Sequence, residues 1–341
     1  MAQAEDARLI GLDWGTSSLR AYLFGDAGEV LGEKSAPSGV MHLERFRTED
    51  RSDAPRETLF EAALKDLCHD WFGECVRRLP VIACGMIGST VGWKEAAYLK
   101  APVGTGELAQ ALTAAKRIDG TAVHIVPGIC STGEPGKMLP EILRGEETQV
   151  AGILANSDVR GDGGGGDLLI GLPGTHSKWV VVAGKRIVSF TTFVTGELYA
   201  LLTSHSVIAK TEKWSEAMDQ ESFGIGLQLA RRRDAEATGG ILSTIFSTRS
   251  KQVLGELKKE QQPDYLSGLL IGEEVTGVER ILARDRRSFT DFSRILLAGN
   301  GDLCTRYRAG CRELSWPVPE IVGDATQRGL WSIAREAGLL S

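Results

Sequence analysis

Two stretches of the chain carry the same pattern of short apolar runs separated by turns of small and polar residues. The first stretch has apolar runs at residues 9–12 and 19–24, and the second has them at 168–172, 179–182 and 187–193. The intervening turns contain glycine together with serine or threonine, residue types that favour chain reversal. Short apolar runs joined by such turns predict antiparallel strands in both stretches.

A second pair of similar segments follows in the same order. Residues 80–88 and 295–301 each form an apolar run that ends in glycines. Two half-chains with a hairpin and a later buried strand predict a duplicated α/β fold rather than a solenoid of short repeats. Because 341 residues exceed what one core usually holds, we expect two lobes, at residues 1–140 and 141–341.

Outside these strands the pattern is mostly helical. A helix is predicted over residues 140–154, opened by a proline and interrupted by Gly145. The glycine-dense segment 156–167 is expected to be a loop, and the region 194–285 is expected to be mostly helical. The charged run 231–234 is interpreted as a solvated face rather than a binding patch.

Composition narrows the classes of function. With 45 acidic and 39 basic residues, a net charge of -6 leaves no basic excess for a phosphate backbone, so no nucleic-acid partner is expected. No run approaches the roughly 18 apolar residues that span a bilayer, and the chain begins with acidic residues where a signal peptide is basic. Six cysteines without a C-x-x-C pair indicate reduced thiols. We expect a cytoplasmic protein with no membrane partner, and its oligomeric state is left open.

The first hairpin turn contains groups suited to phosphate and a divalent cation. Backbone N–H groups and hydroxyls of a glycine-, serine- and threonine-rich turn can surround phosphate oxygens. An adjacent strand-end carboxylate can hold magnesium, directly or through water. The alternative is a plain hairpin turn with an Asx-type hydrogen bond. The candidate nucleotide-binding residues here are Asp13, also the candidate metal ligand, Gly15, Thr16, Ser17 and Ser18.

The second hairpin turn repeats the G-T-x-S pattern. Two such phosphate loops from duplicated halves predict a nucleotide cleft between the lobes. His176 can donate to a phosphate oxygen, and Lys178 can neutralise one or instead point outward at the start of a strand. The candidate nucleotide-binding residues of this loop are Gly174, Thr175, His176, Ser177 and Lys178.

These motifs together resemble the actin-like ATPase superfamily of sugar kinases, Hsp70 chaperones and actin. Its hallmarks are D-x-G-T-x-S, a later G-T-x-S-type loop, and an apolar strand that ends in glycines. The resemblance implies a two-lobed, duplicated ribonuclease H-like fold with a nucleotide cleft between the lobes. It also implies that the glycine-ended strand flanks adenosine, here at Gly299, Asn300 and Gly301.

A closer resemblance is to the 2-dehydro-3-deoxygalactonokinase family. The chain is similar to it in LDWGTSSLRA, GMIGS, RGEETQ, GTHSKW and a late LLAG, from about residue 9 to the C-terminus. The resemblance implies ATP- and magnesium-dependent phosphorylation of 2-dehydro-3-deoxy-D-galactonate to its 6-phosphate in galactonate breakdown. The alternatives are a kinase for another sugar or sugar acid of the superfamily, or a non-kinase ATPase of the actin or Hsp70 type.

The resemblance also indicates where the catalytic carboxylate lies. Sugar kinases of this fold carry it ahead of the second phosphate loop, in a G-D-x-x motif that opens a helix, and this chain has Gly145, Glu146 and Glu147 there. Neighbouring helical side chains point about 100° apart, so we expect only one of Glu146 and Glu147 to face the cleft. The alternative is a solvated acidic pair on a helix.

The sugar acid is expected to bind the first lobe. Gly88 and Ser89 lie at the end of an apolar run, where Ser89 can hydrogen-bond a hydroxyl or keto oxygen. Lys94 is a candidate for the carboxylate of the sugar acid, and the alternative is a solvated lysine.

Overall fold

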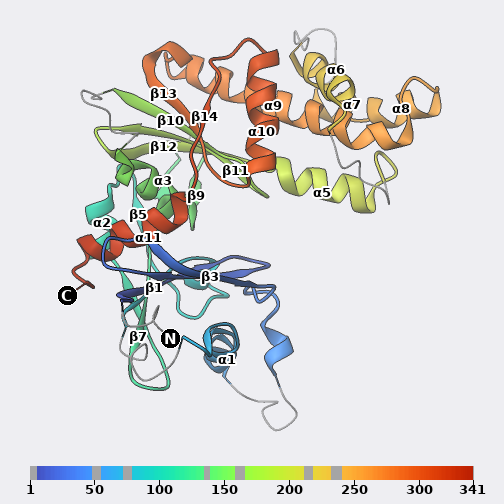
Figure 1. The fold of residues 1–341 in the computed structure, drawn as a ribbon. Helices are drawn as coiled ribbons and strands as arrows, with labels where there is room; N and C mark the ends of the chain where they lie inside the picture. The colour runs from blue at the N-terminus through green and yellow to red at the C-terminus, as the bar shows by residue number, and fades with distance from the viewer. Residues whose placement is uncertain are drawn as a thin grey trace. The chain divides into compact units, whose positions relative to one another are not determined.

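The chain folds into two compact units in the computed structural model. The first comprises Met1–Gly164, Ala183–Ser189 and Asp324–Ser341, and the second comprises Gly165–Val182 and Phe190–Gly323. The structure describes residues 6–47, 55–71, 79–133, 139–157, 166–210, 218–231 and 240–340. Figure 1 labels the helices and strands along the chain.

The first unit is built on a six-stranded sheet in the order β3-β2-β1-β4-β7-β6. Strand β1 pairs antiparallel with β2 and parallel with β4. The apolar side chains of these strands form the core of the unit, in which Trp14 meets Phe60 of helix α1 with ring centroids 5.0 Å apart. The elements are β1 (Leu9–Trp14), β2 (Leu19–Phe24), β3 (Val30–Ala36), α1 (Arg56–Cys68), β4 (Val81–Gly85), β6 (Thr113–Lys116) and β7 (Ala122–Ile125).

A five-stranded sheet in the order β12-β11-β10-β13-β14 lies mainly in the second unit. Here β10 pairs antiparallel with β11 and parallel with β13, the arrangement that β1 has with β2 and β4. The predicted duplication, with both hairpins and both later strands, is therefore confirmed. The strands are β10 (Asp167–Leu172), β11 (Ser177–Ala183), β12 (Arg186–Phe193), β13 (Phe292–Leu297) and β14 (Glu320–Ile321).

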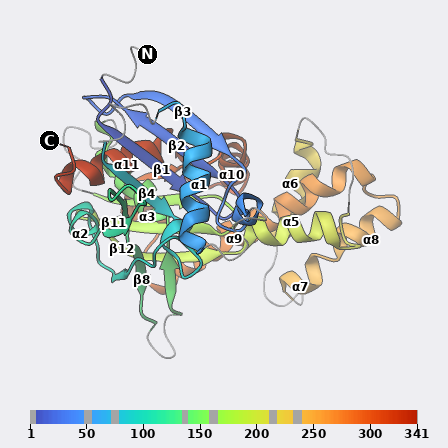
Figure 2. The same ribbon diagram turned by 90° about the horizontal axis from the view of Figure 1, so that it is seen from below.

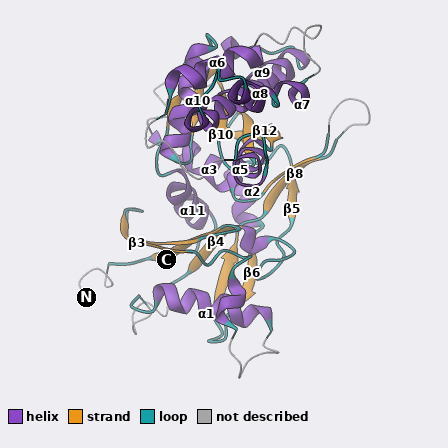
Figure 3. Ribbon diagram, turned by 90° about the vertical axis from the view of Figure 1, so that its right-hand side faces the viewer, coloured by secondary structure: helices purple, strands orange, loops and turns teal. Residues whose placement is uncertain are grey.

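Helices dominate the region 194–285, as predicted, and Figures 2 and 3 show them as one group in the second unit. Helices α6 and α9 cross closely because both carry glycines at the contact: a Cβ on Gly268 would lie 2.0 Å from the Phe223 carbonyl oxygen. Of the charged run 231–234, Arg231 is exposed and the rest lies outside the described residues. The helices are α5 (Thr195–His205), α6 (Gln220–Arg231), α7 (Ile241–Thr244), α8 (Ser247–Val253), α9 (Gln262–Arg284) and α10 (Gly301–Glu313).

The helix predicted from residue 140 begins later, at Glu146. Residues Glu141–Leu143 instead form strand β9, which pairs with β8 (Gly128–Ser131), itself paired with β5 (Tyr98–Lys100). Gly145, with φ of 112°, then turns the chain into helix α3 (Glu146–Ala155). The prediction failed because pairing with a distant strand overrides the local helical pattern.

Helix α3 belongs to the first unit, so the expected division after residue 140 differs from the one observed. It packs on α11 (Ala325–Glu336), and both lie side by side in Figure 1. A Cβ on Gly152 would lie 1.8 Å from the Ala325 carbonyl oxygen, and one on Gly329 would lie 1.9 Å from that of Thr148. The backbones of the two helices therefore touch, and this contact fixes the start of α3.

The remaining short elements are α2 (Thr105–Gln110) and the 3-10 turns η2 (Leu43–Phe46), η5 (Met86–Gly88), η7 (Lys259–Gln261) and η8 (Phe289–Asp291). Within the described ranges, no helix is both long and apolar enough to cross a membrane. Most of the glycine-dense segment 156–167 lies outside those ranges.

Candidate active site

Asp13 lies at the end of β1 beside two other strands. In the register of the sheet it faces Arg20 of β2 and Cys84 of β4, and its Oδ2 lies 3.9 Å from Arg20 Nη1. Its side chain is 27% exposed. Burial raises the pKa of Asp13; the Arg20 guanidinium lowers it, and the negative charge of Glu146 raises it. The carboxylate is therefore held where a cation would stabilise it.

The turn after Asp13 is supported from behind by a second loop. The Gly15 N–H donates to the Ser18 carbonyl at 2.9 Å, and the Gly15 and Thr16 carbonyls accept bonds from residues 40 and 41. Gly39 permits this contact, because a Cβ there would lie 2.3 Å from the Thr16 carbonyl oxygen. Thr16 and Ser17 are exposed at the tip. In the part of the chain that the structure describes, no hydrogen bond joins the Asp13 carboxylate to this turn, so the Asx-turn alternative has no support.

The two glutamates that open α3 lie in different environments. Glu147 is 0% exposed; its Oε2 accepts from the Gly145 N–H at 2.7 Å and its Oε1 from the Thr148 hydroxyl at 3.1 Å. Burial, with a contribution from the charge of Glu146, raises the pKa of Glu147 to about 7. Glu146 is half-buried, and its Oε2 accepts from the Arg144 N–H at 2.9 Å. Glu147 thus closes the start of its own helix, whereas Glu146 keeps access to solvent.

Two glycines bring these acidic groups together. Gly85 ends β4 with φ of 90°, and Gly145 precedes α3 with φ of 112°. A Cβ on Gly145 would lie 3.2 Å from the Gly85 Cα, so the two backbones are in contact. Cys84 is paired with Asp13 in the strand register, and burial raises the pKa of its thiol well above the usual value, with contributions from the charges of Asp13 and Glu147.

The donor set fits magnesium held jointly with phosphate. Among the described residues no group of three or more histidine, cysteine, aspartate or glutamate side chains is placed to hold a metal ion alone. Magnesium is usually bound by one or two carboxylates together with substrate phosphates. Asp13 is a carboxylate of this kind, and a cation beside it would offset the negative charge of Glu146, which raises its pKa.

The residues expected to bind the sugar acid are not all free to do so. Ser89 follows η5 and donates its hydroxyl to the Met86 carbonyl at 2.7 Å, which leaves its oxygen as an acceptor. Lys94 is exposed, and its ammonium donates to the Ala114 carbonyl of β6 at 2.8 Å. Lys94 is therefore neither a purely solvated lysine nor an unengaged cation.

Arg144 lies beside the candidate residue Gly88, although the sequence did not single it out as a binding residue. Its guanidinium lies 4.1 Å from the centre of the Tyr98 ring, and it donates to the Tyr98 hydroxyl at 3.0 Å and the Ala96 carbonyl at 2.8 Å. Its Nη1 is buried beside Gly88, with no hydrogen-bond partner within the described ranges, and a Cβ on Gly88 would lie 2.7 Å from it. The signal was its place in the RGEETQ motif, directly before the glycine that turns into α3.

The loop in the second unit exposes two of its five candidate residues. Gly174 is packed against the start of α5, where a Cβ on Gly196 would lie 2.3 Å from its carbonyl oxygen. Thr175 and His176 are exposed, and His176 Nε2 lies 2.6 Å from Glu197 Oε2. The other two, Ser177 and Lys178, are only 1% and 6% exposed. Lys178 does not point outward, because its ammonium donates to the Thr192 hydroxyl at 2.8 Å.

A cavity of about 250 Å³ in the second unit joins this loop to the glycine-ended strand. Gly299, with φ of 142°, follows β13, and Asn300 caps α10 by accepting from the Leu303 N–H at 3.1 Å. Ligand pockets typically measure about 300–1,000 Å³, so this cavity suits one ring system rather than a whole nucleotide. Its lining includes Gly174, Thr195, Asn300 and Tyr307.

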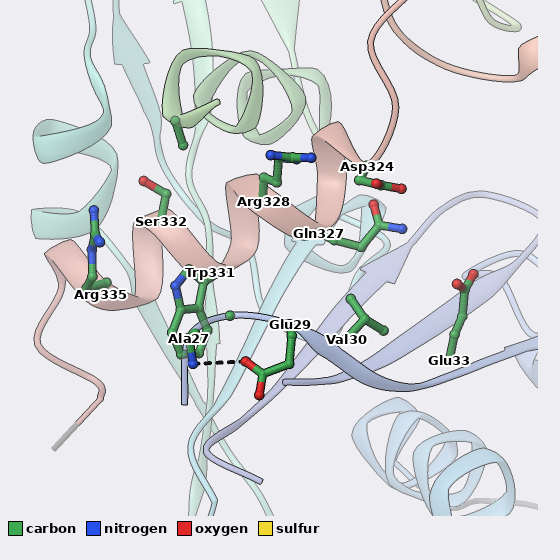
Figure 4. A pocket seen from close by; sticks show the side chains of 12 residues that line it. Ala27, Glu29, Val30, Glu33, Asp324, Gln327, Arg328, Trp331, Ser332 and Arg335 are labelled. Atoms are coloured by element: carbon green, nitrogen blue, oxygen red, sulfur yellow. Dashed lines mark hydrogen bonds between the residues drawn. The ribbon is translucent and has the colours of Figure 1, made fainter. Parts of the chain in front are cut away.

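A larger cavity, of about 610 Å³, lies in the first unit between the β2–β3 turn and α11 (Figure 4). Trp331 lies beneath the turn, and Arg328 and Arg335 flank it on the same helix. None of the candidate nucleotide, sugar-acid or catalytic residues lines this cavity. Size alone therefore does not identify the site of reaction.

The raised pKa of Glu147 predicts a specific dependence of stability on pH. Between about pH 4.5, its ordinary value, and about pH 7, the carboxyl is protonated in the folded protein and ionised in the unfolded chain. Unfolding then releases a proton, so the contribution of Glu147 to the free energy of unfolding falls as pH rises, by up to about 1.4 kcal/mol per pH unit.

Glu147→Gln cannot titrate and should lack this component. Urea unfolding of both proteins from pH 4.5 to 7.5 should show the stability of the wild type declining relative to the variant, since other carboxyls titrate in both. A stability difference that stays constant across this range would contradict the assignment.

Comparison with known proteins places the chain in one family. The model of the 2-keto-3-deoxy-galactonokinase family matches residues 13–333. The chain is 34% identical to the 2-dehydro-3-deoxygalactonokinase of Escherichia coli (strain K12), over 96% of this chain and 98% of that protein. It is 30% identical to a crystal structure assigned as a 2-dehydro-3-deoxygalactonokinase protein from Sinorhizobium meliloti, with a TM-score of 0.75 over 96% of this chain and 98% of that one. The chain therefore belongs to the 2-keto-3-deoxy-galactonokinase family.

Proposed function

We propose that this protein transfers the γ-phosphoryl group of ATP to the 6-hydroxyl of 2-dehydro-3-deoxy-D-galactonate. The observation that carries the proposal is the half-buried Glu146 at the start of α3, next to Gly145, which contacts Gly85 beside the Asp13 carboxylate. A carboxylate with access to solvent beside a candidate magnesium ligand is suited to phosphoryl transfer to an alcohol.

Glu146 is the proposed general base. It accepts the proton of the primary hydroxyl as that oxygen attacks the γ-phosphorus. Glu147 is not suited to this role, because it is fully buried and both of its oxygens accept hydrogen bonds within the first turn of α3. Its hydrogen bonds stabilise that turn and thereby position Glu146 near the end of β4.

In each unit, the hairpin turn is the proposed phosphate-binding loop. Gly15, Thr16, Ser17 and Ser18 contact phosphate oxygens in the first unit, as Gly174, Thr175 and His176 do in the second. Asp13 would hold magnesium, which when bound neutralises charge on the transferred phosphoryl group. The adenine ring is proposed to enter the 250 Å³ cavity, beside Asn300.

The sugar acid is proposed to lie with its carboxylate away from the triphosphate, because two anionic groups in a water-poor site repel strongly. Arg144 places a permanent positive charge beside Gly88, and its guanidinium is fixed by Tyr98 and Ala96. This charge supports a carboxylated acceptor. With the carboxylate near Gly88 and Ser89, the hydroxyl at the other end of the substrate is the one presented to ATP.

The acceptor is tested by steady-state kinetics with 2-dehydro-3-deoxygalactonate, galactonate, galactose and glucose. We expect kcat/KM for the keto acid to exceed that for each neutral hexose at least about hundredfold, since each buried donor left without a partner costs about 1–3 kcal/mol. Galactonate distinguishes a general sugar-acid kinase from one specific for the keto acid. A neutral hexose used as well as the keto acid would overturn both the acceptor and its orientation.

The base is tested by Glu146→Gln with Glu147→Gln as its matched neighbour. Removal of a general base lowers kcat by about 10²- to 10⁴-fold, and KM for ATP should change little. Glu147→Gln should have a smaller effect on kcat, because it alters only the support of Glu146. Equal and small effects of the two substitutions would return the pair to a solvated or structural role.

A further inference from the structure

A buried glutamate of α9 joins three elements of the second unit. Glu274 is 1% exposed, and its Oε1 accepts from the Trp179 indole N–H at 2.7 Å. Its Oε2 accepts from the Tyr307 hydroxyl at 2.7 Å and from the Thr195 hydroxyl. The Tyr307 hydroxyl has one hydrogen, which it donates to Glu274. The Ser177 hydroxyl, whose oxygen lies 2.9 Å from that of Tyr307, therefore donates to Tyr307. One carboxylate therefore connects β11, α5 and α10.

The groups held by Glu274 border the proposed nucleotide site. Thr195 and Tyr307 line the 250 Å³ cavity together with Gly174 and Asn300. Thr195 also begins α5, the helix that packs against Gly174. The cavity and the loop that precedes β11 thus share a single buried support.

Both oxygens of the Glu274 side chain must accept hydrogen bonds. The direct partners are an indole N–H and two hydroxyls, all of which donate. Burial raises the pKa of Glu274, whereas these hydrogen bonds lower it. A glutamine would offer one acceptor oxygen and turn an NH₂ group toward donors, so at least one partner would have to move.

We propose that Glu274 is a positioning residue for ATP, which fixes Thr195 and Tyr307 so that the adenine cavity and the loop at 174–176 receive one nucleotide together. The inference rests on the proposed nucleotide site in the second unit. Glu274 itself contacts no substrate and transfers no proton.

The test compares Glu274→Gln with Glu61→Gln. Glu61 is a matched buried glutamate of the first unit, 7% exposed, which accepts from the Ile118 N–H at 2.9 Å. ADP binding is measured by calorimetry without acceptor, and KM is measured for ATP and for the keto acid. Glu274→Gln should weaken ADP binding about tenfold and raise KM for ATP by a similar factor, because one charge-assisted hydrogen bond is lost. KM for the keto acid should be unchanged. Glu61→Gln should leave both nucleotide measurements at their wild-type values.

Wild-type ADP affinity in a folded Glu274→Gln protein would overturn the proposal. If that variant does not fold, Tyr307→Phe removes a single donor at nearly constant shape. It should weaken ADP binding by a smaller factor, and an unchanged affinity would overturn the proposal equally. Because ADP binding needs no acceptor, a wild-type protein that fails to phosphorylate the keto acid refutes the proposed reaction and leaves this inference to its own test.

Discussion

Three carboxylates are crowded where β1, β4 and the start of α3 meet, and burial opposes the ionisation of two of them. The pKa values of Asp13 and Glu147 are both raised, and in both cases the charge of Glu146 adds to the effect of burial. Such crowding does not favour the folded state, but it is typical of sites where a cation or a transferred proton relieves the repulsion. The packing of the first unit holds these three carboxylates together.

Backbone contacts impose this arrangement. Gly85 and Gly145 adopt positive φ and their backbones touch, which places the start of α3 against the end of β4. Helix α11 packs on the other side of α3 through Gly329. The second copy of the fold repeats the strand order without the acids: Pro173 follows Ile-Gly-Leu where Asp13 follows it in the first copy. Duplication has thus yielded an acidic site in one unit and a neutral loop beside a cavity in the other.

Much of this fold was predictable because its strands are short apolar runs that end in glycine turns. This pattern is local in the sequence and does not depend on distant partners. Both hairpins, strand β13 and the helical region of the second unit follow from it. The strand at 141–143 was not predictable, since it forms by pairing with β8. The same holds for the interior positions of Lys178 and Glu274 and for the contacts of Arg144, which depend on partners distant in sequence. Spacing alone predicted that only one of Glu146 and Glu147 would face the cleft. That Glu147 is the buried one depends on the turn at Gly145, which the spacing does not reveal.

The claim that Asp13 and Glu146 act on one reacting centre is tested most directly by a double-mutant cycle on kcat with Asp13→Asn, Glu146→Gln and the combined variant. Residues that act as a unit are strongly non-additive, so the combined variant should be little slower than the slower single variant. Losses that multiply, with the combined variant slower by the product of the two single effects, would show that the two carboxylates act independently and would contradict the account.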